Sequence, residues 1–398
     1  MRPWAARSAL PVTLLVQAAA SAATIAPAVA APRLLEALGL GPVAVGVYIA
    51  IVYLGAMVSS QWGAAWVRRH GPIFTSQWSL ATCAIGVLLV SVPNVALAAL
   101  GALLVGFGYG PITPASSAML ARTTPPERYA LVFSIKQTGV PLGGAVAALL
   151  VPLALSRGGA PWALGQIALL CGLGIALAET LRRDLDAERD RDAPRPGRAD
   201  LLRPLRFVLA HDVLRKLAWC SMVFSAVQVC LTSYIVTFLS SDLHWTLVAA
   251  GVGAAVAQAA GIGGRILWGF AADRRRDSRS ILIVLALVML LCGLALGLTP
   301  AGSATGWVFA ILALYGATAI GWNGVFLATV ARLVPTQQAA AATSGSLFFT
   351  YFGVVVGPPI FGVVATATGR LGVGFMLLAV PLVWAGVSLW RADWKSHD

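Results

Sequence analysis

Long apolar segments separated by short polar ones make up almost the whole chain. Residues 281–300 and 307–329, for example, contain no Asp, Glu, Lys, Arg or His. Each run is near the ~20 residues that a helix needs to cross ~30 Å of hydrocarbon. Backbone groups cannot stay unpaired in lipid, and apolar runs without period-two alternation favour helices over barrel strands. The pattern therefore predicts an all-α membrane protein with about twelve transmembrane helices.

The predicted spans form two sets of six, separated by a charged stretch at residues 182–216. This stretch interleaves acidic residues with arginines and cannot form an apolar core, so we expect a solvated linker. We divide the chain into a six-helix bundle at 1–181, a linker at 182–213 and a second six-helix bundle at 214–398. The predicted spans are 8–31, 42–66, 73–93, 95–121, 130–155, 161–181, 214–239, 246–271, 280–299, 306–331, 338–367 and 372–391.

Charge is scarce but unevenly placed. Of the 398 residues, 59% are hydrophobic and 11% charged, yet the net charge is +13. We assign only Arg33, Arg157 and Arg370 to loops on one side, and nearly all other basic residues lie on the opposite side. This asymmetry predicts that the basic side, with both termini, is cytoplasmic. We expect a monomer in a bacterial inner membrane, with the lipid bilayer as partner. The charge does not indicate nucleic acid, because no binding module accompanies it.

The N-terminus imitates a secretory signal. Arg2 and Arg7 precede an apolar run, and residues 28–30 resemble a cleavage site. Cleavage would leave an odd number of spans and remove one member of a symmetric set. We therefore expect the first helix to be retained.

Three pairs of short segments repeat in the same order in the two halves. Residues 63–68 match 269–274, residues 121–125 match 331–335, and residues 139–144 match 357–362. The first pair is offset by 206 positions and the second by 210. Parallel repeats of six helices are a known way to build a carrier that rocks about a central site.

These segments also carry a family resemblance, which extends over essentially the whole chain. Residues 269–274 resemble the G-x-x-x-D-R loop motif of the major facilitator superfamily, and 139–144 are similar to its glycine-proline motif in the fifth helix. Residues 264–269 look like the branch of monocarboxylate, oxalate and cyanate carriers. The first-half loop departs from the motif, with Val67 where Asp is expected. The resemblance implies alternating access, with gating by Asp273, Arg274, Arg68, Gly139, Pro141, Gly357 and Pro358.

Two basic side chains, Lys136 and Arg265, lie inside predicted spans. Lys136 is eight positions after Arg128 and Arg265 eight before Asp273, so each is ~12 Å from its loop, near the midplane. A charge there is costly and marks function by default. An arginine fork and a lysine point charge would together hold an anion. By resemblance, an arginine at the position of Arg265 binds the substrate carboxylate.

Structural roles remain open for both residues. Arg265 can bond backbone carbonyls and brace its helix. Lys136 can pair with a carbonyl near Pro141 or extend toward the cytoplasm. The polar residues Gln17, Gln228, Asn323 and Tyr351 also lie within spans, where each either lines the substrate site or bonds a neighbouring helix.

No acidic residue lies deep in a predicted span, so we expect the substrate to supply the negative charge. No catalytic constellation, metal-ligand cluster or phosphate-binding loop is visible, and we predict neither an enzyme nor a cofactor. The sequence predicts a transporter of a small organic anion, a carboxylate above all. The alternatives are an exporter of hydrophobic compounds and a non-transporting membrane sensor. Substrate identity, direction and coupling ion stay open.

Overall fold

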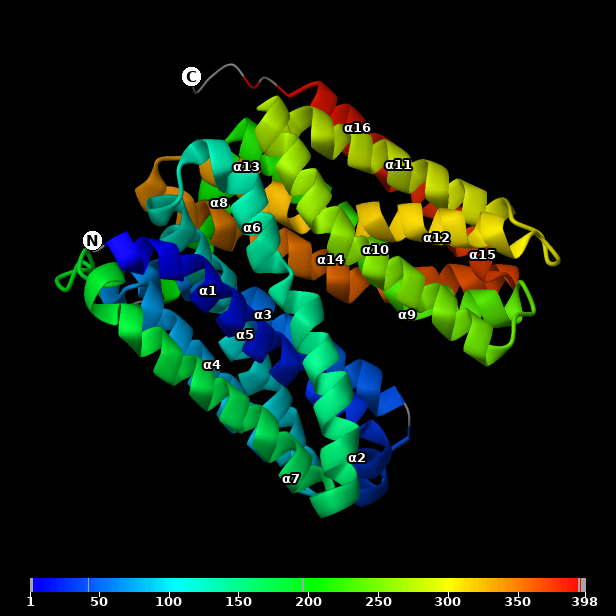
Figure 1. The fold of residues 1–398 in the computed structure, drawn as a ribbon, viewed down its shortest axis with the longest axis horizontal. Coiled ribbons are helices and arrows are strands. Elements are labelled where there is room, and N and C mark those ends of the chain that lie inside the picture. Colours follow the sequence, from blue (N-terminus) through cyan, green and yellow to red (C-terminus); the bar gives the residue numbers. More distant parts are fainter. Residues whose placement is uncertain (1–2, 42, 195–196, 393, 395–398) are drawn as a thin grey trace. The chain divides into compact units, whose positions relative to one another are not determined.

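The computed structural model describes residues 3–41, 43–194, 197–392 and 394, which contain helices and turns but no strand. Eleven helical segments are long and apolar enough to cross a membrane. The longest, Pro126–Leu185, is broken at Gly158 and Gly159, whose φ angles are −151° and +69°. Its two arms fold back on one another (Figure 1), so this segment contains the two spans predicted at 130–155 and 161–181.

The helices, in chain order, are α1 (Pro3–Val29), α2 (Ala31–Leu38), α3 (Val43–His70), α4 (Pro72–Val90), α5 (Val95–Thr123), α6 (Tyr129–Gln137), α7 (Gly139–Leu185), α8 (Arg198–Ala210), α9 (Asp212–Ser241), α10 (Leu247–Arg275), α11 (Ser278–Leu298), α12 (Thr305–Ala319), α13 (Asn323–Arg332), α14 (Ala339–Thr368), α15 (Leu371–Leu377) and α16 (Ala379–Trp390). Two short 3₁₀ turns, η1 (Pro126–Arg128) and η2 (Thr336–Gln338), precede α6 and α14.

The chain packs as two compact units. Unit 1 comprises Met1–Pro126, Ile135–Phe207 and Val334–Phe348, and unit 2 comprises Glu127–Ser134, Val208–Leu333 and Phe349–Asp398. Each half of the sequence thus contributes one short helical segment to the unit built mainly by the other half. The predicted division of the chain into two six-helix halves, joined by a linker at 182–213, follows the sequence repeat and remains a prediction. The two units are defined instead by which residues pack together.

In unit 1, glycines let α7 lie directly on α1. A Cβ atom at Gly143 would be 2.1 Å from the carbonyl oxygen of Ala18, and one at Gly139 would be 2.7 Å from that of Leu14. Any larger residue at either position would push the two backbones apart. The glycine-proline segment at 139–144 therefore sets the distance between the first and fifth spans.

Unit 2 repeats this arrangement between α14 and α9. A Cβ atom at Gly353 would be 2.1 Å from the carbonyl oxygen of Met222, and one at Gly357 would be 2.9 Å from the Cβ of Ala226. The hydroxyl of Tyr234 donates to the carbonyl of Pro358 at 2.9 Å. The second glycine-proline segment thus packs the eleventh span on the seventh, as the first packs the fifth on the first.

The span predicted at 306–331 is not one continuous helix. It is interrupted at residues 320–322, between α12 and α13. The amide of Gly321 donates to Thr318 at 3.2 Å, one residue short of the α-helical partner. That partner, the carbonyl of Ala317, accepts instead from the indole N–H of Trp268 on α10 at 2.8 Å. A side chain from a neighbouring helix therefore takes the helical acceptor at the break.

The prediction of a wholly solvated linker is wrong at several positions among the described residues. Asp186, Ala193 and Asp200 are all buried in unit 1. Burial here does not require apolar residues, because the last turn of α3 offers backbone carbonyls and the first turn of α4 offers backbone amides as hydrogen-bond partners. The linker packs through hydrogen bonds, which the composition of the stretch does not reveal.

Candidate substrate-binding site

Unit 1 holds Lys136 in a buried polar cluster. Its side chain is 1% exposed. The ammonium donates to Gln17 Oε1 at 2.7 Å, to Gln137 Oε1 at 3.1 Å and to Thr113 Oγ1 at 3.4 Å. An ammonium has three donors, and here they meet three neutral oxygens. These three hydrogen bonds join the ammonium to uncharged groups.

Three helices, α1, α5 and α6, position this cluster. Gln17 lies on α1, 14 residues after Pro3 and 12 before Val29. Its amide nitrogen donates to the hydroxyl of Tyr109 on α5 at 3.4 Å. Lys136 lies one residue before the end of α6, and the glycine packing of α7 on α1 brings that end against Gln17.

The sequence predicted Gln17 and Lys136 as site residues, and the structure brings them together. It missed Gln137, Thr113 and Tyr109. Two of these carried a signal: Gln137 adjoins the buried lysine, and Thr113 stands between two prolines inside a span. Polar residues at such positions are candidates for the same cluster.

Unit 2 holds a second polar cluster at the helix break. Gln228 Oε1, on α9, accepts from the indole N–H of Trp322 at 3.0 Å and from the amide of Asn323 at 3.0 Å. Trp322 is 1% exposed, whereas Gln228 and Asn323 are half-buried. Gln228 and Asn323 were predicted as site residues, and Trp322 was missed because an aromatic residue in an apolar span carries no polar signal.

Arg265 is buried in unit 2, on α10, with 1% of its surface exposed. Its neighbour Gly264 lies against α12, where a Cβ atom would be 2.2 Å from the carbonyl oxygen of Ala317. This contact packs α10 at Gly264 on the end of α12, next to the helix break. Tyr351, the remaining predicted site residue, is 5% exposed on α14 in the same unit.

Asp273 bonds the start of another helix in unit 2. Its two carboxylate oxygens accept from the amides of Ala130 at 2.9 Å and Leu131 at 2.7 Å, in the first turn of α6. Arg332 forms an ion pair with the same carboxylate. A carboxylate at a helix N-terminus meets unpaired amides and the positive end of the helix dipole. Arg274 is exposed beside it in the last turn of α10, as Arg68 is in the last turn of α3.

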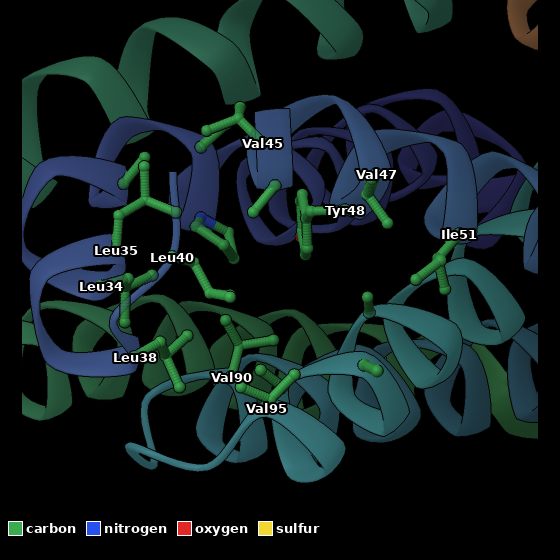
Figure 2. A pocket seen from close by; sticks show the side chains of 17 residues that line it. Leu34, Leu35, Leu38, Leu40, Val45, Val47, Tyr48, Ile51, Val90 and Val95 are labelled. Atoms are coloured by element: carbon green, nitrogen blue, oxygen red, sulfur yellow. The ribbon is translucent and has the colours of Figure 1, made fainter. Parts of the chain in front are cut away.

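A separate apolar pocket of about 130 Å³ lies in unit 1 among α1, α2, α3 and α5 (Figure 2). Aliphatic side chains such as Leu34, Leu38 and Val95 surround it, and no charged residue lines it. The hydroxyl of Tyr48 already donates to the carbonyl of Thr24 at 3.1 Å. The pocket therefore suits an apolar ligand rather than a carboxylate.

Comparison with known proteins identifies the family. Residues 13–358 match the Major Facilitator Superfamily, and the chain belongs to that family of membrane transporters. A search among curated proteins finds no match. The family and the fold indicate a multi-pass membrane transporter of small molecules rather than an enzyme.

Solved structures share the fold at low identity. The chain is similar to the fucose:proton symporter FucP of E. coli, with 14% identity, 96% of this chain and 98% of that chain covered, and a TM-score of 0.73. It is similar to the proton:xylose symporter XylE bound to 6-bromo-6-deoxy-D-glucose, with 14% identity, coverage of 98% and 96%, and a TM-score of 0.76. A bacterial homologue of the iron transporter ferroportin in an outward-facing state gives 15% identity, coverage of 98% and 99%, and a TM-score of 0.76.

Removing the charge of Asp273 is expected to slow transport. Asp273→Asn keeps the shape of the side chain, but its single oxygen can accept from only one of the two amides, and its NH2 group cannot accept from the other. The remaining hydrogen bond is neutral and about half as strong as a charge-assisted one. We expect a transport rate about fivefold lower, with substrate affinity within about threefold of the parent, because Asp273 is predicted to act in gating rather than in binding. Rate is measured by flux in proteoliposomes and affinity by binding in detergent.

Asp277→Asn is the matched control. Asp277 also caps a helix, accepting from the amide of Ser280 at 2.9 Å at the start of α11. Asp277→Asn removes one negative charge from a helix cap, as Asp273→Asn does. Asp277 caps its own helix, α11, whereas Asp273 lies on α10 and caps α6. Equal rates for the two variants would show that Asp273 has no special role in gating.

Proposed function

We propose that this transporter carries a small organic anion with a carboxylate group by alternating access, and that it belongs to the monocarboxylate, oxalate and cyanate branch. The observation that carries the proposal is a pair of fully buried cationic side chains, Lys136 in unit 1 and Arg265 in unit 2. In this proposal, each of them contacts the substrate during the transport cycle.

The chemistry of the two groups favours an anion. A buried charge is costly, at roughly 2.5–3.5 kcal/mol at the centre of a membrane helix. Three hydrogen-bond partners of Lys136 are neutral oxygens, so none of these three bonds is an ion pair. An anionic substrate lowers this cost when it binds, and a guanidinium can bond both oxygens of a carboxylate at once.

The polar side chains around the two cations complete the proposed site. Gln17 orients the Lys136 ammonium, and Gln228, Asn323 and Tyr351 recognise the neutral part of the substrate. Gating falls to Asp273 with Arg274, to Arg68, and to the two glycine-proline segments at Gly139, Pro141, Gly357 and Pro358. We further propose that the protein is a monomer in a bacterial inner membrane with both termini in the cytoplasm, as the charge asymmetry predicts.

The apolar pocket favours a second candidate function, the efflux of hydrophobic compounds. Its aliphatic lining provides no group that would recognise a carboxylate. A hydrophobic substrate would instead bind there through area burial alone. The two candidates therefore place substrate against different residues.

A ligand screen by thermal unfolding separates the candidates. The purified protein is heated with small mono- and dicarboxylates, neutral sugars and hydrophobic cations. A carboxylate at 100 times its Kd is expected to stabilise the folded protein by about 2.7 kcal/mol. The shift should disappear in Arg265→Ala and persist in Ala98→Leu, a change in the apolar pocket. Stabilisation by hydrophobic compounds alone, lost in Ala98→Leu, would instead support efflux.

A further inference from the structure

The segment that follows α7 is fastened to unit 1 by a buried carboxylate. We call residues 186–194 together with Gly197 the strap. Asp186, at its start, is 1% exposed. Its Oδ1 accepts from the amide of Ile73 at 2.8 Å and its Oδ2 from the amide of Phe74 at 3.0 Å, in the first turn of α4. Burial raises the pKa of this carboxyl group, and the two amides offset part of that rise.

The loop between α3 and α4 is built around this carboxylate. Gly71 has φ +92°, a conformation that other residues rarely adopt. A Cβ atom at Gly71 would lie 2.3 Å from Cγ of Asp186. Gly71 is the only residue between α3 and α4, and the Asp186 carboxyl group lies against it. A side chain at this position would collide with that carboxyl group.

The rest of the strap follows the end of α3. The amide of Asp190 donates to the carbonyl of Arg68 at 2.9 Å, and Arg69 donates to the carbonyl of Ala193. The indole of Trp62 donates to the carbonyl of Gly197 at 3.0 Å. These bonds cover the last two turns of α3, the part that carries the first-half loop motif.

Unit 2 shows what the first-half motif lacks. There the motif carboxylate, Asp273, binds two helix amides and pairs with Arg332. The first-half loop has Val67 in its place, and Arg332 corresponds to Arg122 at the repeat offset of 210. Arg122 pairs with Glu188 of the strap at 2.6 Å. Glu188 of the strap thus pairs with Arg122 as Asp273 of the second-half loop pairs with Arg332.

We propose that the strap is the gating element of the first half, in which Asp186 and Glu188 together replace the missing loop carboxylate. Asp186 provides the cap on two consecutive helix amides, and Glu188 provides the arginine partner. The proposal rests on alternating access but not on an anionic substrate.

The cavity under the strap gives a direct test. Val67, Arg122, Glu188 and Ala118 line one cavity of about 450 Å³. Val67→Asp would place a carboxylate in this cavity, on the same side as Arg122, and restore the motif. A single reporter cysteine, Ala118→Cys, is introduced into the full chain after its five native cysteines are replaced. Its reaction with a hydrophilic maleimide measures how often the strap opens.

Opening of the strap is expected to depend on its carboxylates. We expect Asp186→Ala and Glu188→Ala each to speed labelling at least about fivefold, and Val67→Asp to reverse most of the increase in Glu188→Ala. Asp192→Ala, which removes an exposed acid of the same segment, should label like the parent. Melting temperatures recorded on the same samples establish that each protein is folded.

Three outcomes would overturn the proposal. One is Glu188→Ala labelling no faster than Asp192→Ala. Another is that Glu188→Ala speeds labelling but the added Val67→Asp does not slow it again, because a strap with only a structural role would not respond to a carboxylate on α3. The last is slower labelling in either strap variant. If Asp186→Ala does not fold, Glu188→Ala still decides, since its side chain is 77% exposed and its loss does not disturb the core. No substrate is used, so the result is independent of the carboxylate hypothesis.

Discussion

Arg265→Lys is expected to weaken carboxylate binding by about tenfold to hundredfold, although it keeps the positive charge. A guanidinium forms two parallel bonds to a carboxylate, whereas an ammonium acts as a point charge. The loss corresponds to roughly 1.5–3 kcal/mol, the range for hydrogen bonds to charged groups. Arg265→Ala, which also removes the charge, should lose at least as much. The measurement is the Kd of the carboxylate identified by the thermal screen, in detergent.

A bracing role for Arg265 predicts a different pattern. Arg265 is buried and follows Gly264, which packs on α12, so a structural arginine would lower the melting temperature of the variants and leave the Kd of the folded fraction unchanged. Arg275→Lys, at the exposed end of the same helix, controls for the general effect of exchanging the two residues. Parent-like carboxylate affinity in folded Arg265→Ala would exclude Arg265 from the anion site.

The spans were predictable because the bilayer leaves a chain few alternatives. Backbone groups in lipid must pair within helices, so the length of an apolar run fixes the element. The predicted runs at 73–93 and 280–299 correspond to α4 and α11 within a few residues. Lys136 and Arg265 could be recognised as candidate site residues because burying a charge in an apolar span is unfavourable in free energy. Both side chains are buried in the structure.

Which polar groups meet could not be read from the sequence. Gln17 and Lys136 are 119 positions apart, and their 2.7 Å contact depends on glycines that let α7 lie on α1. The break between α12 and α13 likewise depends on Trp268, 49 residues before the carbonyl that it takes. No local pattern encodes such contacts, because they arise from the packing of distant helices.

The strap was missed for a different reason. Its charged composition predicts a solvated connector, because that prediction assumes that only apolar residues become buried. Asp186 is nevertheless buried, because it replaces water at two helix amides that need an acceptor. Gly71 was the available sequence signal: a lone glycine between two spans marks a position where backbone and another group approach closely.

Gln17→Glu is expected to reduce anion affinity by about tenfold or more without removing any cationic group. Gln17 Oε1 lies 2.7 Å from the Lys136 ammonium, so a carboxylate of the same shape would pair with it inside the protein. A tethered counter-anion is always present at the site and competes with the substrate for the same charge. The folded state should be at least as stable as the parent, since a buried cation gains an ionic partner.

The size of the effect distinguishes charge from shape. Gln17→Met removes the amide without adding charge, and we expect it to lose less affinity than Gln17→Glu. Gln137→Glu, 3.1 Å from the same ammonium, should reproduce the Gln17→Glu result from the other side of the cluster. Combining Gln17→Glu with Arg265→Ala should cost less than the sum of the two changes, because both act on one ligand. If Gln17→Glu and Gln17→Met bind the carboxylate equally well, the charge of Lys136 does not act on the substrate, and its hydrogen bonds serve the fold alone.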